Sequence, residues 1–199
     1  RQADLGLVAK QEQTHEKSNA SYFINYVIAQ VSEKYGDDAI YKDGLKIYTT
    51  LDMDAQNAAV AAMQNLPNYY TDSNGLHQPQ GAIVAMNPHN GYIMAMVGGR
   101  GDDAFNRATQ AERQPGSAMK PFVYLAAIQS GKTPGSIVDD SPVTFGNWSP
   151  KNYENDFVGS ITYRYALQHS RNVAAVKIAD EVGMSKIIKL AKEMGISTL

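Results

Sequence analysis

The sequence predicts an α+β fold in which an antiparallel sheet has helices on both faces. Two apolar runs, at residues 81–86 and 92–97, are joined by a segment that contains Asn90-Gly91, and Asn-Gly is a strong signal for a hairpin turn. Both runs are almost continuously apolar, which is typical of strands whose two faces are covered. Helical patterns dominate residues 117–199 and supply candidates for that cover. Because two strands cannot complete such a sheet, we expect the fold to be incomplete in this chain.

The composition is that of a globular protein and excludes several functions. The 199 residues are 43% hydrophobic and 19% charged, with a net charge of −2. This charge gives no reason to expect a nucleic-acid partner. The chain has no cysteine, its four histidines lack a metal-ligand spacing, and no glycine loop of the phosphate-binding type occurs. We therefore expect no metal ion and no cofactor.

The first part of the chain, residues 1–43, is expected to be a linker or a small packing segment. Residues 1–18 are polar and of mixed charge, and a helix is predicted from Ser21 to Tyr35. The sequence opens at Arg1 and has no apolar run long enough to cross a membrane. We interpret the chain as a piece of a longer protein, and we expect a membrane anchor in the missing N-terminal part.

Residues 44–199 are expected to belong to the main domain. Apolar and polar residues alternate over 45–51, which predicts a strand with one buried face, and Asp52 can cap a helix over 53–65. Prolines and small polar residues predict loops at 67–79 and 132–160. Further helices are predicted from Ser117 to Gly131, from 160 to 167, from 172 to 183 and from 185 to 194.

Ser117 and Lys120 are the first candidates for chemistry, three residues apart at the start of a predicted helix. Residues at this spacing share a helix face, with Cβ atoms about 5–6 Å apart, so the hydroxyl and the amine can share a hydrogen bond. Pro121 has no N–H group and therefore places the serine in the first turn. A lysine that burial keeps neutral can take the serine proton during nucleophilic attack. The alternative is a helix-capping serine followed by a solvated lysine.

Ser170 and Asn172 are the second candidates, two residues apart between two predicted helices. At this spacing both side chains can point the same way, the hydroxyl toward a nucleophile and the amide toward a bound peptide. The alternative is that one of them caps the following helix and has no other role.

Together these motifs resemble the N-terminal part of the transpeptidase domain of bifunctional (class A) penicillin-binding proteins. The nucleophile motif around Ser117 and the Ser-Arg-Asn motif at 170–172 stand in the family's order, and the likeness covers residues 20–199. Other phrases that match the family, in register, are residues 44–52, 81–100, 105–109, 149–153 and 164–170. The resemblance implies a penicillin-binding/serine β-lactamase-like fold.

The resemblance also implies an active-site serine acyltransferase, a D-Ala-D-Ala transpeptidase that cross-links peptidoglycan stem peptides on the outer face of the bacterial plasma membrane. Ser117 would attack the carbonyl between the last two D-alanines, and Lys120 would take the serine proton. Ser170 would relay a proton to the leaving amine, and Asn172 would bind the substrate amide. β-Lactam antibiotics, which resemble D-Ala-D-Ala, would acylate Ser117.

Trp148, Asn152 and Tyr153 match a further stretch of the family. The resemblance implies that they bind substrate as a wall of the cleft. The alternative is that they pack the long loop.

One departure from the family is clear: its third motif, Lys-Thr-Gly or Lys-Ser-Gly, does not occur in this sequence. In the family that strand supplies the second oxyanion N–H, and the loss of one such donor can cost about 10²–10³ in rate. We therefore interpret residues 44–199 as the first part of the domain, poorly active without the remainder that carries this motif. Two alternatives stay open: a β-lactam hydrolase, and a non-catalytic module for β-lactam sensing or partner docking.

Overall fold

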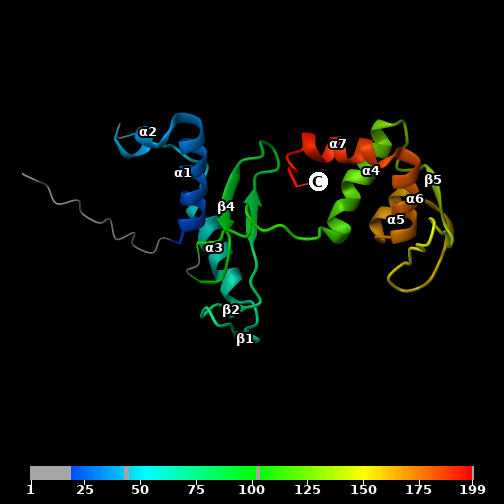
Figure 1. The fold of residues 1–199 in the computed structure, drawn as a ribbon, viewed down its shortest axis with the longest axis horizontal. Coiled ribbons are helices and arrows are strands. Elements are labelled where there is room, and N and C mark those ends of the chain that lie inside the picture. Colours follow the sequence, from blue (N-terminus) through cyan, green and yellow to red (C-terminus); the bar gives the residue numbers. More distant parts are fainter. Residues whose placement is uncertain (1–18, 43–44, 102–103, 199) are drawn as a thin grey trace, which may run out of the picture. The chain divides into compact units, whose positions relative to one another are not determined.

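The computed structural model describes residues 19–42, 45–101 and 104–198. These residues divide after Ala111 into two compact units, each of which is described by itself (Figure 1). The predicted linker at residues 1–18 lies outside the described residues. In the described part of the chain, no helix has the length and apolar character needed to cross a membrane. The assignment of residues 44–199 to one domain stays a prediction.

The first unit combines helices with two short hairpins. The predicted helix from Ser21 to Tyr35 is confirmed, and the helix predicted after Asp52 begins at Met53. Part of the predicted loop at 67–79 instead forms a small hairpin. The elements of this unit are α1 (Ser21–Tyr35), α2 (Asp37–Tyr41), α3 (Met53–Gln64), β1 (Tyr70–Thr71), β2 (His77–Gln78), β3 (Ile83–Met86) and β4 (Ile93–Val97).

The predicted antiparallel pair is confirmed as β3 and β4, with Ile83 opposite Val97. Helix α3 packs on one face of this hairpin, against Ala95 and Val97. The opposite face carries Val84 and Met86, which are exposed. Met96, which lies opposite Val84 on this second face, is buried and is in contact with Asn106, so the second face is covered in part.

The strand predicted at residues 45–51 is wrong, because no strand forms there. Leu45 and Ile47 are 49% and 41% exposed, so the alternating pattern has no buried face in this unit. At the end of the segment, the Thr50 hydroxyl donates to the Ile93 carbonyl (2.6 Å) and the Asp52 N–H donates to Met94 (2.9 Å). Alternation yields a strand only where a neighbour supplies a ladder of backbone hydrogen bonds, and these two contacts do not make one.

Gln56 on α3 is fully buried and ties this helix to β4. Its side chain accepts the N–H of Met96 (2.9 Å) and donates to the carbonyls of Met96 (3.1 Å) and Asn19 (2.7 Å). A leucine at this position would leave buried backbone groups unpaired, at a cost of about 1–3 kcal/mol each. We expect Gln56→Leu to lower the free energy of unfolding by about 2–4 kcal/mol in urea titrations, through the same loss. The exposed Gln64→Leu on the same helix is the control, and equal stability of the two variants would contradict this role.

The second unit is mostly helical. Its elements are η1 (Gly116–Met119, a 3₁₀ turn), α4 (Lys120–Gln129), β5 (Ile137–Asp140), β6 (Gly159–Thr162), α5 (Tyr163–Gln168), α6 (Asn172–Val182) and α7 (Met184–Glu193). The helices predicted to start near 117, 172 and 185 are confirmed within a few residues.

The region predicted as irregular, 132–160, contains a strand that the sequence analysis missed. β5 pairs antiparallel with β6, so that Val138 lies opposite Ile161. The helix predicted from residue 160 therefore begins only at Tyr163, and the hydroxyl of Thr162 caps it by accepting the N–H of Tyr165 (3.1 Å). Prolines stand on either side of β5 and two of its four residues are aspartates, which are rare in strands, so the local sequence has the pattern of a loop.

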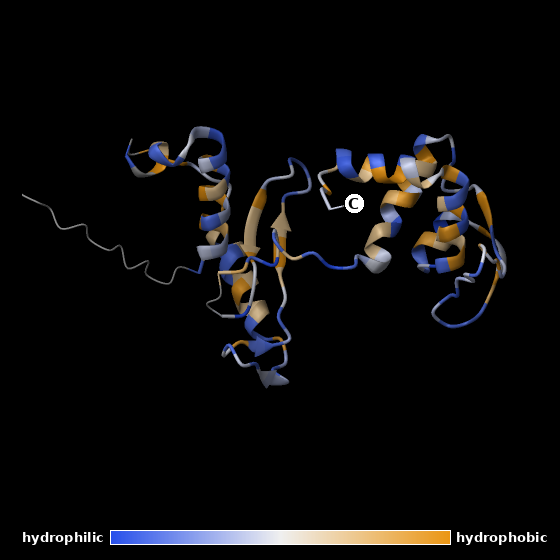
Figure 2. Cartoon of the chain, in the orientation of Figure 1, coloured by the Kyte–Doolittle hydropathy of each residue, from blue (hydrophilic) through white to orange (hydrophobic). Residues whose placement is uncertain are grey.

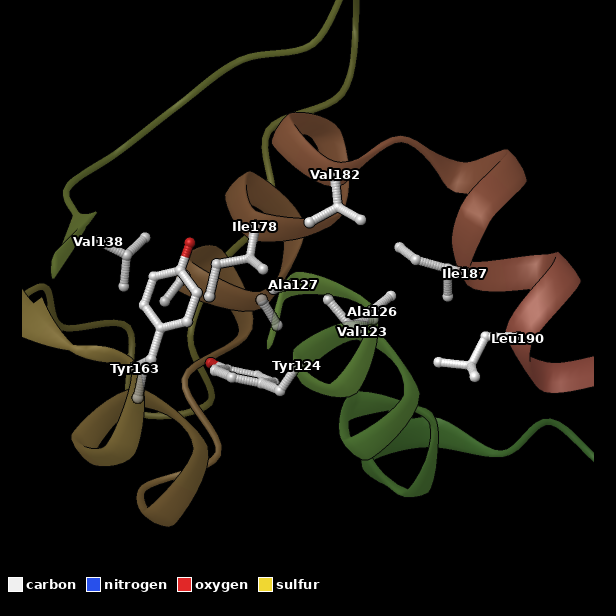
Figure 3. Packing of buried hydrophobic residues seen from close by; sticks show 13 residues of the cluster. Val123, Tyr124, Ala126, Ala127, Val138, Tyr163, Ile178, Val182, Ile187 and Leu190 are labelled. Atoms are coloured by element: carbon white, nitrogen blue, oxygen red, sulfur yellow. The ribbon is translucent and has the colours of Figure 1, made fainter. Parts of the chain in front are cut away.

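The core of the second unit lies between α4, α6 and α7 (Figure 3). The rings of Tyr124 and Tyr163 meet edge to face, with centroids 5.8 Å apart. Helix α7 is amphipathic, and the buried residues Ile187 and Leu190 on its apolar face join this core (Figures 2 and 3). The packing fixes α4 and α6, the two helices whose first residues carry the candidate site.

Candidate active site

Ser117 and Lys120 lie where α4 begins. Ser117 is in the 3₁₀ turn η1, and the N–H of Lys120 donates to the Ser117 carbonyl. In an α-helix this carbonyl would accept the N–H of residue 121, but Pro121 has none. The proline thus explains why the first turn is of the tighter 3₁₀ type.

The side chains of Ser117, Lys120 and Ser170 contact one another. Lys120 Nζ lies 3.2 Å from Ser117 Oγ and 2.8 Å from Ser170 Oγ, and the two hydroxyl oxygens are 3.0 Å apart. Ser117 is exposed, whereas Lys120 is only 8% exposed. A hydroxyl that a peptide can reach is therefore backed by a buried amine. This geometry does not fit the alternative of a capping serine beside a solvated lysine.

The amine of Lys120 also contacts two carbonyl oxygens, the main-chain oxygen of Ser170 (2.5 Å) and Oδ1 of Asn172 (2.6 Å). A carbonyl oxygen only accepts, so each of these contacts uses one N–H of the amine. A neutral amine has two N–H groups and one lone pair, which leaves the lone pair for a serine hydroxyl. Burial lowers the pKa of Lys120 below its ordinary value of 10.5, which favours this neutral form.

Ser170 has a left-handed backbone, with φ of 51°. Helix α5 ends in a turn where the N–H of Ser170 donates to Leu167 (3.0 Å) and that of Arg171 to Ala166 (2.9 Å). This is a Schellman ending, in which glycine usually takes the left-handed position. A residue with a Cβ atom is strained there by about 1–2 kcal/mol. In return, the hydroxyl of Ser170 reaches both Ser117 and Lys120.

Asn172 is the first residue of α6, and its amide is held on both sides. Oδ1 accepts from Lys120, and Nδ2 donates to the carbonyl of Lys151 (3.1 Å). The backbone N–H groups of Asn172 and Val173 donate instead to Oδ1 of Asn152 (2.8 and 3.1 Å). The helix is therefore capped from another segment, which argues against a purely capping role for Ser170 or Asn172.

Asn152 is 3% exposed, so the expected direct contact with substrate does not fit the structure. Its Nδ2 donates to the carboxylate of Asp140 (3.0 Å) and to the carbonyl of Asp156 (2.9 Å). With Oδ1 bound to α6, the whole hydrogen-bonding capacity of this amide is used inside the protein. The side chain supports the start of α6.

Trp148 lines an apolar groove of about 520 Å³ that runs beside Lys120 and Asn172. Its side chain is 56% exposed, as expected for part of a cleft wall. Tyr153 is 92% exposed and is not among the residues that line this groove. The structure thus brings Trp148 to the candidate site but not Tyr153.

Sequence reasoning missed Asp140 and Arg171, which form a buried ion pair next to the site. Arg171 Nη2 lies 2.6 Å from Asp140 Oδ2, and the two residues are 6% and 0% exposed. A usable signal was present, because an arginine between two candidate residues must point away from both. A basic side chain that points inward needs an acidic partner.

Comparison with known proteins gives the class. The family model of the penicillin-binding protein transpeptidase domain matches residues 81–199, more than half of the chain. The chain belongs to this family.

Particular relatives agree with this assignment. Penicillin-binding protein 1A of Rickettsia conorii is 46% identical over 125 residues, which is 59% of this chain and 16% of that protein. Penicillin-binding protein 2D of Bacillus subtilis is 35% identical over 192 residues, or 91% of this chain and 27% of that protein. The structure of PonA1 from Mycobacterium tuberculosis in complex with penicillin V is similar with a TM-score of 0.75 and 27% identity, over 92% of this chain and 48% of that one. The mixed α+β fold is thus that of penicillin-binding protein transpeptidases over part of the domain, and the chain spans a minor part of its curated relatives.

Proposed function

We propose that this chain carries the nucleophile half of a serine D-Ala-D-Ala transpeptidase that cross-links peptidoglycan stem peptides. The proposal rests on one observation above all, the mutual hydrogen-bond contacts of Ser117 Oγ, Lys120 Nζ and Ser170 Oγ. Its place of action is the outer face of the bacterial plasma membrane, where peptidoglycan lies. Its further partners are β-lactam antibiotics and the segment that carries the Lys-Thr-Gly or Lys-Ser-Gly motif.

In the acylation step, neutral Lys120 takes the proton of Ser117 while Oγ forms a bond to the carbonyl carbon of the penultimate D-alanine. The tetrahedral intermediate then expels the terminal D-alanine, whose nitrogen receives a proton through Ser170. The distances of 3.2 Å and 3.0 Å from Ser117 Oγ to Lys120 Nζ and Ser170 Oγ suit these transfers. The product is an ester of Ser117 and free D-alanine.

In the second step, the amine of another stem peptide attacks the ester and restores the Ser117 hydroxyl. Asn172 binds the substrate amide in this proposal, and the support for this role is that its own amide is held beside Lys120. A β-lactam enters at the first step, where its ring opens on Ser117. The ring-opened amine stays tethered, so a stable acyl-enzyme results.

A hydrolase would need a second base to drive water onto the ester. Glu181, one of the acidic residues after Ser170, pairs with Lys132 and accepts from the hydroxyl of Tyr163. The hydrogen bond from Lys132 holds the pKa of this carboxyl below its usual range. A carboxylate that is engaged in this way is a poor candidate for activating water.

The proposal predicts covalent labelling of the 199-residue chain by a fluorescent penicillin. One label should be found at Ser117 by peptide mass spectrometry, and Ser117→Ala should take none. Because the sequence has no Lys-Thr-Gly or Lys-Ser-Gly motif, we expect labelling to be about 10²–10³ times slower than in a complete domain. Ser185→Ala, which removes an exposed serine that does not line the groove, is the matched control and should label like the unsubstituted chain.

The other outcomes point to other functions. A label that forms at Ser117 and is released within minutes as hydrolysed penicillin would indicate a hydrolase. Reversible binding that Ser117→Ala retains would indicate a sensing or docking module. If prolonged incubation leaves Ser117 unlabelled, the proposed function fails.

A further inference from the structure

We propose that Asp140 is a positioning residue for acyl transfer, which acts through Asn152 and Arg171 to hold Ser170 and Asn172 against Lys120. The inference rests on the proposed function, because it assigns those two residues to that reaction. Asp140 itself does not contact Ser117 or Lys120 in any hydrogen bond of the described residues.

The carboxylate of Asp140 is fully buried at the end of β5 and is surrounded by hydrogen-bond donors. Oδ2 accepts from Nε and Nη2 of Arg171, at 2.9 and 2.6 Å. Oδ1 accepts from Nδ2 of Asn152, at 3.0 Å. A carboxylate only accepts hydrogen bonds, so both neighbours must present donors to it.

The second step is the orientation of the Asn152 amide. Because Nδ2 faces Asp140, Oδ1 must face the opposite way, toward the first N–H groups of α6. Those N–H groups belong to Asn172 and Val173 and have no partner within the helix. A reversed amide would set Nδ2 against both of them and leave them unpaired. The carboxylate of Asp140, together with the carbonyl of Asp156, thus sets the direction of the amide that caps the start of α6.

The third step is the backbone at Arg171, which is extended, with φ of −63° and ψ of 121°. In extended backbone, successive side chains point to opposite sides. The buried guanidinium accordingly pairs with the buried Asp140 and with the exposed Asp156, while Ser170 and Asn172 on either side contact Lys120. Anchoring Arg171 on one side fixes its two neighbours on the other.

Together the contacts clamp the segment 170–173 by the side chain of Arg171 and by the backbone N–H groups of Asn172 and Val173. The clamp also opposes relaxation of the strained left-handed backbone of Ser170. A displacement of about 1 Å at reacting groups can cost about 10² in rate, so the clamp should be felt in acylation although it touches no substrate.

Asp140→Asn tests the role, because it keeps the shape but places a donor where the network needs an acceptor. If the amide oxygen of the new side chain at position 140 keeps the hydrogen bonds from Arg171, then its NH₂ group faces the NH₂ group of Asn152, and two donors meet without an acceptor. We expect acylation of Ser117 by penicillin to slow by about 10², at a temperature where circular dichroism shows an intact fold. Asp139→Asn is the matched control on the same strand, since Asp139 is half exposed and pairs with Lys177. It should stay within about twofold of the unsubstituted chain, as usual for surface changes.

Rescue separates positioning from a general loss of stability. In the double variant Asp140→Asn with Asn152→Asp, the amide at 140 donates to a carboxylate at 152, which again accepts from α6, although the hydrogen bond to the Asp156 carbonyl is lost. Each single variant should be slow, and the double variant should recover at least tenfold over Asp140→Asn. If Asp140→Asn does not fold, the double variant should fold and acylate. If the double variant is acylated no faster than the slower of the two single variants, the proposal is overturned.

A second measurement does not depend on turnover. In NMR titrations of ¹³C-labelled lysine, Asp140→Asn should move the pKa of Lys120 back toward 10.5, because a loosened segment admits water to the amine. In the double variant Asp140→Asn with Asn152→Asp, the pKa of Lys120 should be lowered again. If the unsubstituted chain takes no penicillin, the proposed function fails while this titration still tests the clamp. A folded Asp140→Asn chain with unchanged acylation or unchanged Lys120 pKa overturns the inference.

Discussion

Replacing Lys120 with methionine is expected to slow acylation of Ser117 by penicillin by about 10²–10⁴-fold, the usual contribution of a positioned general base. Methionine keeps the length and apolar character of the side chain, so it fills the same buried space. It cannot accept the proton of Ser117, and it leaves the carbonyl oxygens of Ser170 and Asn172 without their donor. The measurement is the second-order rate of label incorporation relative to the unsubstituted chain.

The pH dependence gives a second readout of the same residue. The neutral amine is the base, so the rate should rise with pH through a pKa below 10.5 and should be independent of this group in Lys120→Met. The free energy of unfolding should also rise with pH in this range. Between the lowered pKa of Lys120 in the folded chain and 10.5, the unfolded chain binds more protons than the folded chain, so raising the pH favours the folded chain. Lys177→Met, which changes a lysine paired with Asp139, is the control and should keep both profiles. An unchanged rate in Lys120→Met would refute the role of Lys120 as base.

Ser170→Gly and Ser170→Ala should separate the strain at this position from its chemistry. Both variants lack the hydroxyl and should slow acylation by about 10²-fold, because the proton relay to the leaving amine is lost. The glycine variant should be more stable than the alanine variant by about 1 kcal/mol in chemical denaturation, since only alanine keeps a Cβ atom at φ of 51°.

Asn155 provides the matched control, because it is also a residue other than glycine with a positive φ, of 56°. Asn155→Gly should relieve less strain, because asparagine tolerates the left-handed region better than serine or alanine, and it should leave the acylation rate unchanged. If Ser170→Gly kept the full rate, the hydroxyl would have no part in the reaction, and the strained serine would need another explanation.

The sequence was sufficient to place the proposed nucleophile beside its proposed base. Ser117 and Lys120 are joined by local helix geometry, and Pro121 marks the position of the first turn, so their contact follows from spacing. Ser170 and Asn172 required more, because their approach to Lys120 depends on the packing of α6 against α4. The resemblance supplied that information in place of geometry.

Two errors have a common physical cause, which is that pairing and burial are properties of the tertiary structure. The alternating segment 45–51 has the pattern of a strand but finds no ladder in its unit. The amide of Asn152 has the donor and acceptor groups that could bind a substrate, yet it is turned inward by its hydrogen bond to the carboxylate of Asp140, twelve residues away. Neither a missing neighbour nor a buried partner is visible in the local sequence.

The proline that follows Lys120 has a consequence for alignment. In a 3₁₀ turn, residues three apart lie directly above one another, whereas in an α-helix they are rotated by about 60°. By withholding an N–H from the carbonyl of Ser117, Pro121 keeps the turn tight and so favours the contact between the Ser117 hydroxyl and the Lys120 amine. A residue with no reactive atom of its own thereby sets the angle at which the two reactive groups meet.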